Sequence, residues 1–185
     1  MLLHRVFAYP PTAGPGESGH PDYLHRPQGA SRFDNPLHYD VWYLADSPSG
    51  AVGETFADVP RWEPSMLVFP ALPGSVRALG TYFIPDNLAL LDLDSGRNLA
   101  DRSLRPTEVI TRVRAVTQPL ALSVFNERDA AGDRMWAGVR WWSYHRPTWP
   151  ICAVWVGTPE NVDVQELTLD HPAVRDAART LTRPL

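Results

Sequence analysis

The sequence predicts an α+β fold in a single compact domain, and three observations support this class. Segments with strand character outnumber segments with helical spacing, and no internal repeat appears along the chain. The 19 prolines and 12 glycines in 185 residues predict short elements separated by turns, which excludes a helical bundle. A hydrophobic fraction of 44% over this length is enough for one buried core. We therefore expect one domain over residues 1–185.

The first third of the chain divides into a strand, a long loop, a second strand and a helix. Residues 2–9 have strand character, and residues 11–30 combine Pro, Gly and His without a period, which predicts a surface loop. Residues 41–44 predict a short strand. Ser47 is typical of a helix N-cap because Pro48 follows it, and the apolar spacing predicts a helix up to Pro60.

The remainder of the chain alternates between short strands and two further helices. Strands are expected at residues 66–69, 76–84, 88–93, 138–143, 151–156 and 161–169. A helix is expected from Thr107 to about Arg128, interrupted or kinked at Pro119. A last helix is expected after Pro172, where small apolar residues recur at helical spacing.

The charge pattern limits the classes of partner. All 17 basic residues are arginine, and the net charge is −4, which argues against broad nucleic-acid binding and leaves room for a local cationic pocket. No apolar run approaches the roughly 20 residues of a membrane-spanning helix. The N-terminus lacks the pattern of a signal peptide, and the single Cys152 provides no internal disulfide. We therefore expect a cytoplasmic protein without a membrane partner.

Several familiar catalytic and metal-binding patterns are absent from the sequence. The six histidines show no HExxH spacing and have one cysteine beside them, so no metal is expected. Cys152 lies in an apolar run, which predicts a buried and inert thiol. The sequence contains no GxSxG elbow, no phosphate-binding P-loop and no GxGxxG.

Tryptophans concentrate in one stretch of the sequence, at Trp136, Trp141, Trp142, Trp149 and Trp155. Strand alternation would place Trp141 and Ser143 on one face, and Arg140 and Trp142 on the other. Two interpretations remain: most of these rings form the core, or they form an aromatic wall that binds a planar ring or a sugar.

Two charged residues lie where a charge needs an explanation. Glu54 occurs in the expected helix among apolar residues, where a carboxylate either faces solvent or requires a hydrogen-bonding partner. Arg32 occurs in a loop-like stretch, where an arginine is either solvated or binds an anion.

Together these segments resemble the RES domain family, which is named for an arginine, a glutamate and a serine. The resemblance rests on residues 29–36 (GASRFDNP), 41–48 (VWYLADSP) and 51–54 (AVGE), beside a family pattern of roughly G-G-R-[WF]-N-P, L-Y-L-A-x-S-P and A-x-x-E. Residues 137–143 and 169–175 are similar to later family segments. The resemblance therefore spans nearly the whole chain. Ala30 and Ser31 stand in place of the family's paired glycines, and the family asparagine corresponds to either Asp34 or Asn35.

The resemblance implies a compact mixed sheet with short helices, like that of ADP-ribosyltransferases, and an NAD+-degrading toxin. Such toxins cleave the nicotinamide–ribose bond by hydrolysis or phosphorolysis, and an Xre-like helix-turn-helix antitoxin silences them. NAD+ would thus be the substrate, inorganic phosphate a second substrate in the phosphorylase case, and no metal would be needed. The sequence does not distinguish water from phosphate as the acceptor, and it is silent on oligomeric state.

The resemblance also assigns site residues. Arg32, Tyr43, Glu54 and Ser143 match the family's arginine, tyrosine, glutamate and serine, and Arg5 matches a further arginine near the N-terminus. Arg32 and Arg5 would hold the pyrophosphate. Tyr43 would stack on nicotinamide, and Glu54 would stabilise an oxocarbenium-like ribose. Ser143 would donate a hydrogen bond to the ribose or the amide.

Two alternatives stay open at this point. The same fold also suits an enzyme that transfers ADP-ribose to a macromolecule. A non-catalytic binding module built on the tryptophan-rich stretch would bind a ligand without consuming NAD+.

Overall fold

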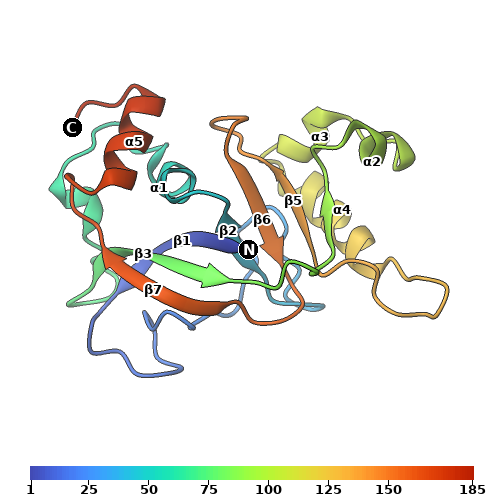
Figure 1. The fold of residues 1–185 in the computed structure, drawn as a ribbon, viewed down its shortest axis with the longest axis horizontal. Helices are drawn as coiled ribbons and strands as arrows, with labels where there is room; N and C mark the ends of the chain where they lie inside the picture. The colour runs from blue at the N-terminus through green and yellow to red at the C-terminus, as the bar shows by residue number, and fades with distance from the viewer. The chain divides into compact units, whose positions relative to one another are not determined.

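The computed structural model describes residues 1–185 and contains seven strands, five α-helices and one 3₁₀ helix, η1 (Figure 1). The strands are β1 (Leu2–Tyr9), β2 (Trp42–Ala45), β3 (Val76–Phe83), β4 (Leu90–Asp92), β5 (Gly138–Trp142), β6 (Pro150–Val154) and β7 (Glu160–Glu166). The helices are α1 (Pro48–Phe56), η1 (Pro64–Leu67), α2 (Gly96–Asp101), α3 (Pro106–Ile110), α4 (Arg114–Asn126) and α5 (Pro172–Leu181). The strand pairing is mixed, since β4 and β5 pair in parallel whereas β5 and β6 pair antiparallel. The predicted α+β class is confirmed.

The chain divides into two compact units. Unit 1 comprises Met1–Leu24, Leu44–Ile84 and Pro159–Leu185, and unit 2 comprises His25–Tyr43 and Pro85–Thr158. The strand order is β2-β1-β3-β7 in unit 1 and β4-β5-β6-β2 in unit 2, so β2 contributes residues to both. The expectation of a single domain over residues 1–185 stays a prediction.

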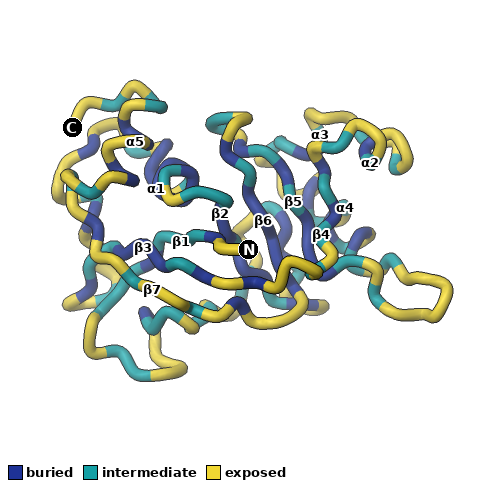
Figure 2. Tube along the Cα trace, in the orientation of Figure 1, coloured by how far each residue is buried: buried dark blue, intermediate teal, exposed yellow.

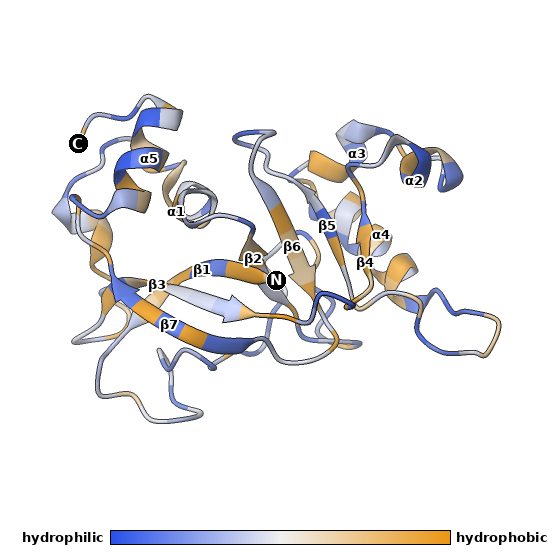
Figure 3. Ribbon diagram, in the orientation of Figure 1, coloured by the Kyte–Doolittle hydropathy of each residue, from blue (hydrophilic) through white to orange (hydrophobic).

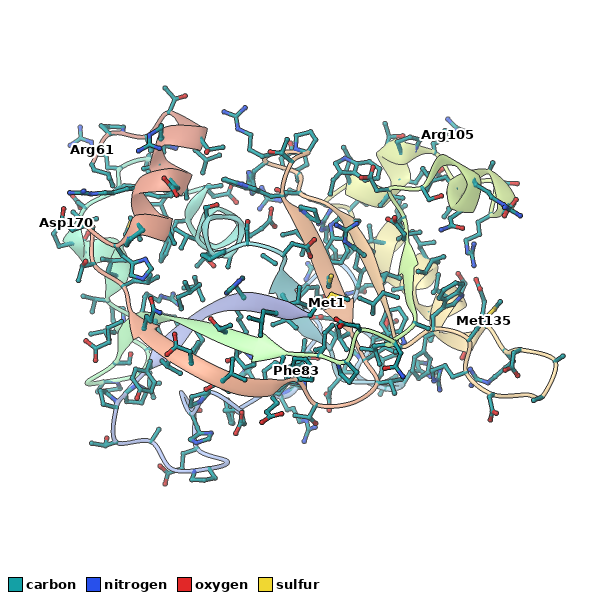
Figure 4. The ribbon with its side chains drawn as sticks, in the orientation of Figure 1. Met1, Arg61, Phe83, Arg105, Met135 and Asp170 are labelled. Carbon is teal, nitrogen blue, oxygen red and sulfur yellow. The ribbon has the colours of Figure 1, made fainter.

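The sheet of unit 1 is built on a long antiparallel pair. Strand β1 pairs with β3 from Leu2 opposite Phe83 to Tyr9 opposite Val76, and β7 continues the sheet beyond β3. The N-terminal ammonium of Met1 donates to the carbonyl oxygen of Ile84 at 2.6 Å, at the end of the sheet where Met1 and Phe83 lie (Figure 4). β7 has no buried residue, unlike β1 and β3 (Figure 2).

Two helices cover one side of this sheet. Helix α1 begins as predicted, because Ser47 Oγ accepts a hydrogen bond from the amide of Gly50 at 3.1 Å and Pro48 occupies the first turn. It ends at Phe56, earlier than the predicted limit at Pro60. α1 packs against α5 and β1 (Figure 1). The buried stripe of α5 consists of Ala173, Val174, Ala177 and Ala178, as its spacing predicts.

The N-cap of α5 is a histidine whose two contacts fit its neutral form. His171 Nδ1 accepts from the amide of Ala173 at 3.2 Å, and Nε2 lies 3.0 Å from Gln165 Oε1, so the neutral ring fits both contacts. Burial lowers the pKa of His171 below its ordinary 6.5. Below pH 6.5 the unfolded chain therefore binds more protons than the folded one, and this contribution to stability, complete above 6.5, is lost as pH falls through the lowered pKa.

We expect His171→Asn, which keeps an N-cap acceptor without a titrating ring, to lose less stability on acidification than the wild type. The measurement is the urea midpoint at pH 7.5 and at pH 5.5 for both proteins. Burial also lowers the pKa of His4, so we expect the variant to retain part of the pH dependence of stability. An identical loss in both proteins would show that the N-cap is not the titrating element.

The structure corrects two predictions of secondary structure and adds one helix that was not predicted. Residues 66–69, predicted as a strand, form the end of η1 and an isolated bridge between Val68 and Val76. The helix predicted from Thr107 to Arg128 is two helices, and the break falls at residues 111–113, while Pro119 lies inside α4. Helix α2 was not predicted, although Ser95 caps it by accepting from Asn98.

Unit 2 buries the apolar residues of β6 and three of the five clustered tryptophans. Ile151 to Val154 are buried, which includes Cys152, and Figure 3 shows the hydrophobic colouring of β6. The buried rings are Trp141, Trp149 and Trp155, whereas Trp136 and Trp142 are half-buried. This burial favours the core interpretation of the cluster. No helix of the chain is both long enough and apolar enough to cross a membrane.

Candidate functional site

The loop that carries Arg32 is ordered by hydrogen bonds from within. We call residues 29–35 the Arg32 loop. The buried carboxylate of Asp34 accepts from the amides of Gly29 and Ser31, both at 2.8 Å from Oδ2. Asn35 Nδ2 donates to the hydroxyl of Tyr39 at 2.8 Å. Of the two candidates for the family asparagine, Asp34 therefore holds the backbone around Arg32, because a charged acceptor of this kind pins a turn, and Asn35 ties the loop to Tyr39.

Tyr43, at the start of β2, fastens this loop through its hydroxyl. Tyr43 Oη donates to Asp34 Oδ1 at 2.7 Å and accepts from the amide of Phe33 at 3.0 Å. Burial, and then the charge of Asp34, raise the pKa of Tyr43 far above its ordinary value, so the phenol stays neutral. Its ring meets Trp141 edge to face, with 6.5 Å between the ring centroids.

The half-buried guanidinium of Arg32 lies among aromatic rings and one backbone carbonyl. Nη1 donates to the carbonyl oxygen of Ile110 at 3.0 Å. The guanidinium carbon lies 5.3 Å from the ring centroid of Trp141, within cation–π range. Phe33 packs edge to face on the same Trp141 ring at 4.6 Å. These contacts restrict the guanidinium, whose planar fork has the geometry of a phosphate- or carboxylate-binding group.

Ser143 follows β5 and is 1% exposed, on the same buried face as Trp141, as predicted. Its Oγ accepts from the amides of His145 at 2.9 Å and Arg146 at 3.2 Å, which closes a tight turn. The oxygen of Ser143 thus organises the turn that follows β5.

Glu54 and Arg5 belong to unit 1. Glu54 is half-buried on α1, between buried Gly53 and exposed Thr55, so it lies at the margin of the buried stripe rather than wholly in core or solvent. Arg5 is half-buried on β1, and both terminal nitrogens lie 3.5 Å from the carbonyl oxygen of Tyr23. Burial lowers the pKa of Arg5, and the group remains a cation at neutral pH.

The structure brings Arg32 and Tyr43 together around Trp141. Sequence reasoning missed the ordering role of Asp34, although it adjoins Arg32 in the motif, and missed Thr117, which had no motif to indicate it. Thr117 is buried and donates to the carbonyl oxygen of Arg32 at 2.6 Å. No group of three or more His, Cys, Asp or Glu side chains is arranged to hold a metal ion.

Replacing Tyr43 by phenylalanine is expected to destabilise the fold by about 1–3 kcal/mol, because it leaves Asp34 Oδ1 and the amide of Phe33 without this hydroxyl in a buried setting. Urea unfolding followed by circular dichroism measures the loss. The matched control is Tyr9→Phe, at a half-buried tyrosine of β1, with an expected change of at most about 0.5 kcal/mol. Equal effects of the two substitutions would contradict the anchoring role of Tyr43.

Comparisons with known proteins agree with this fold. The family model described as "RES domain" matches residues 3–176. Three solved chains match, among them a chain of the M. tuberculosis MbcT–MbcA toxin-antitoxin complex. That chain is 17% identical in sequence, and the alignment covers 97% of this chain and 88% of that one with a TM-score of 0.59. At this identity the likeness shows a shared fold. The search of curated proteins finds no match.

Proposed function

This chain belongs to the RES domain family, and from that premise we propose that it is a toxin that degrades NAD+ by cleaving the nicotinamide–ribose bond. The observation that carries the proposal is the ordering of Arg32, whose guanidinium is held over Trp141 by an anchored loop. A restricted arginine beside an aromatic ring suits a ligand that combines phosphates with planar rings.

In the proposed reaction the glycosidic C–N bond breaks and its electron pair stays on the nicotinamide nitrogen, which becomes neutral. The ribose carbon then forms a C–O bond to water, which releases a proton, or to phosphate. Because nicotinamide leaves as a neutral ring, no strong general acid is required. Positive charge accumulates on the ribose in the transition state, as in other glycosidic cleavages.

Each site residue has a role in this scheme. Arg32 and Arg5 bind the pyrophosphate oxygens through charge-assisted hydrogen bonds. The hydroxyl of Tyr43 is bonded to Asp34, so the ring is the part of this side chain that we assign to stacking on nicotinamide. Glu54 stabilises the oxocarbenium-like ribose as an ionised carboxylate, and Ser143 donates a hydrogen bond to the ribose or the carboxamide.

The proposed function also implies a partner and a location in the cell. One of its solved fold relatives is described as a chain of a toxin-antitoxin complex, and we propose an Xre-like helix-turn-helix antitoxin as the partner of this chain. NAD+ is a metabolite of the cytoplasm, which is where the proposed toxin would act.

The test is to incubate the purified protein with NAD+, with and without inorganic phosphate, and to separate the products chromatographically. Release of free ADP-ribose indicates hydrolysis, and a phosphorylated ADP-ribose that appears only with phosphate indicates phosphorolysis. NAD+ labelled in its adenylate half detects transfer to a macromolecule. A folded wild-type protein that binds NAD+ and releases no nicotinamide would instead support the binding-module alternative.

A further inference from the structure

A second segment of unit 2 forms hydrogen bonds with the Arg32 loop. Residues 110–118, the end of α3 and the start of α4, contribute the contacts. They are Arg32 Nη1 to the Ile110 carbonyl oxygen at 3.0 Å, Thr117 Oγ1 to the Arg32 carbonyl oxygen at 2.6 Å, Asn35 Nδ2 to the Gln118 carbonyl oxygen at 3.0 Å, and Gln118 Nε2 to the carbonyl oxygens of Gly29 at 3.2 Å and Ser31 at 3.0 Å. The side chain and the backbone of Arg32 are both held by this one segment.

The break between α3 and α4 makes the first of these contacts available. In a continuous helix the carbonyl of Ile110 would accept from the amide of Arg114, four residues on. Because α3 ends at Ile110, its carbonyl is one of those that a helix C-terminus leaves without an intrahelical donor. The guanidinium of Arg32 donates to it instead, so the interruption of the helix is matched to the position of Arg32.

Thr117 makes the contact closest to the backbone of Arg32. Its side chain is completely buried, and it is one of four buried polar residues of the chain. The hydroxyl donates to the carbonyl of Arg32 itself, so it fixes the peptide that sets the direction of the arginine side chain.

We propose that Thr117 is a positioning residue for Arg32, which places the guanidinium for the phosphates of the dinucleotide before the ligand arrives. The proposal rests on the proposed function for the identity of the ligand. A cation ordered in advance loses less conformational freedom on binding, so the gain falls mainly on affinity rather than on bond cleavage. Thr117 touches neither substrate nor reacting atoms in this scheme.

The test compares Thr117→Val, which removes the hydroxyl at nearly constant shape, with Thr117→Ser, which retains it. We expect Thr117→Val to raise KM for NAD+ about 5–20-fold while kcat changes less than about twofold, since the loss falls on ground-state and transition-state binding alike. Thr117→Ser should recover KM to within about threefold of the wild type. Ser75→Ala removes another buried hydroxyl that donates to a backbone carbonyl, in unit 1, and should leave KM unchanged.

Amide hydrogen exchange of residues 29–35 supplies a readout independent of turnover. Thr117→Val should exchange faster there than the wild type, and Ser75→Ala should not. An unchanged KM and unchanged exchange in Thr117→Val would overturn the positioning role, as would equal KM increases in the Val and Ser variants. A wild type without NAD+ turnover would refute the proposed function, and the exchange experiment would still decide whether Thr117 orders the loop.

Discussion

Glu54→Gln is expected to lower kcat for nicotinamide release about 10²–10³-fold while the protein stays folded. The amide keeps the shape and half-buried position of the side chain on α1 and removes its negative charge. A fixed charge that stabilises a developing cation acts mainly in the transition state, and loss of one such electrostatic contact costs rates of this order. KM for NAD+ should change only a few-fold, because the bound ground state carries no ribosyl cation.

Steady-state nicotinamide release, measured together with the far-ultraviolet circular dichroism spectrum, checks this expectation. Glu63→Gln is the matched control, because Glu63 is an exposed carboxylate of the same unit that accepts from Ser65 Oγ. Its kcat should stay within about twofold of the wild type. If Glu54→Gln turns over NAD+ as fast as Glu63→Gln, the carboxylate of Glu54 does not take part in cleavage.

Arg32→Ala is expected to raise KM for NAD+ about 10–100-fold. The substitution removes the proposed charge-assisted bonds to the pyrophosphate, and hydrogen bonds to charged groups are worth about 1.5–3 kcal/mol each. It also removes the cation above Trp141 and leaves the carbonyl of Ile110 without its donor. Arg32→Lys should recover only part of the affinity, because a single ammonium cannot reproduce a planar fork.

The control for this series is Arg97→Ala, which removes the same charge from an exposed arginine of unit 2 that lies 3.8 Å from Asp101. Isothermal titration with NAD+ and KM from initial rates give independent values for both variants. Equal weakening by Arg97→Ala and Arg32→Ala would mean that overall charge, and not the ordered guanidinium, governs binding.

Elements determined by local chemistry were predictable from the sequence. Strand β1 has the predicted bounds, because a largely apolar segment that ends at two prolines favours a strand up to the first proline. Helices α1 and α5 begin where a capping residue precedes Pro48 and Pro172, since proline at the first turn loses no helical hydrogen bond. The fold class and these helix starts therefore follow from short windows of sequence.

Elements that depend on tertiary contacts could not be predicted from the sequence. A four-residue apolar run such as 66–69 carries no period that separates a strand from a helical turn. The break after Ile110 falls among β-branched residues of moderate helix propensity, whereas Pro119, the obvious helix breaker, is accommodated within α4. Helix propensity therefore predicts the break at Pro119 instead of after Ile110. It takes no account of the hydrogen bond that the carbonyl of Ile110 accepts from Arg32, which is distant in sequence.

The candidate site divides in the same way. Arg32, Tyr43, Glu54 and Ser143 come from motif blocks, whereas Thr117 reaches Arg32 across 85 residues of sequence. A single buried threonine in a helix gives no pattern that distinguishes a hydrogen bond to a loop from ordinary packing. Asp34 adjoins Arg32, yet its three donors are visible only when the loop is folded.

Unit 1 is assembled from three separate stretches of sequence, and this affects when it can fold during synthesis on the ribosome. The helix that carries Glu54 packs against α5, and β3 pairs with β7, yet both of these contacts come from the last segment, Pro159–Leu185. Contacts that close such long loops form only after the distant residues are available. The proposed catalytic carboxylate therefore reaches its folded surroundings only once residues 159–185 are available to pair with β3 and to pack against α1.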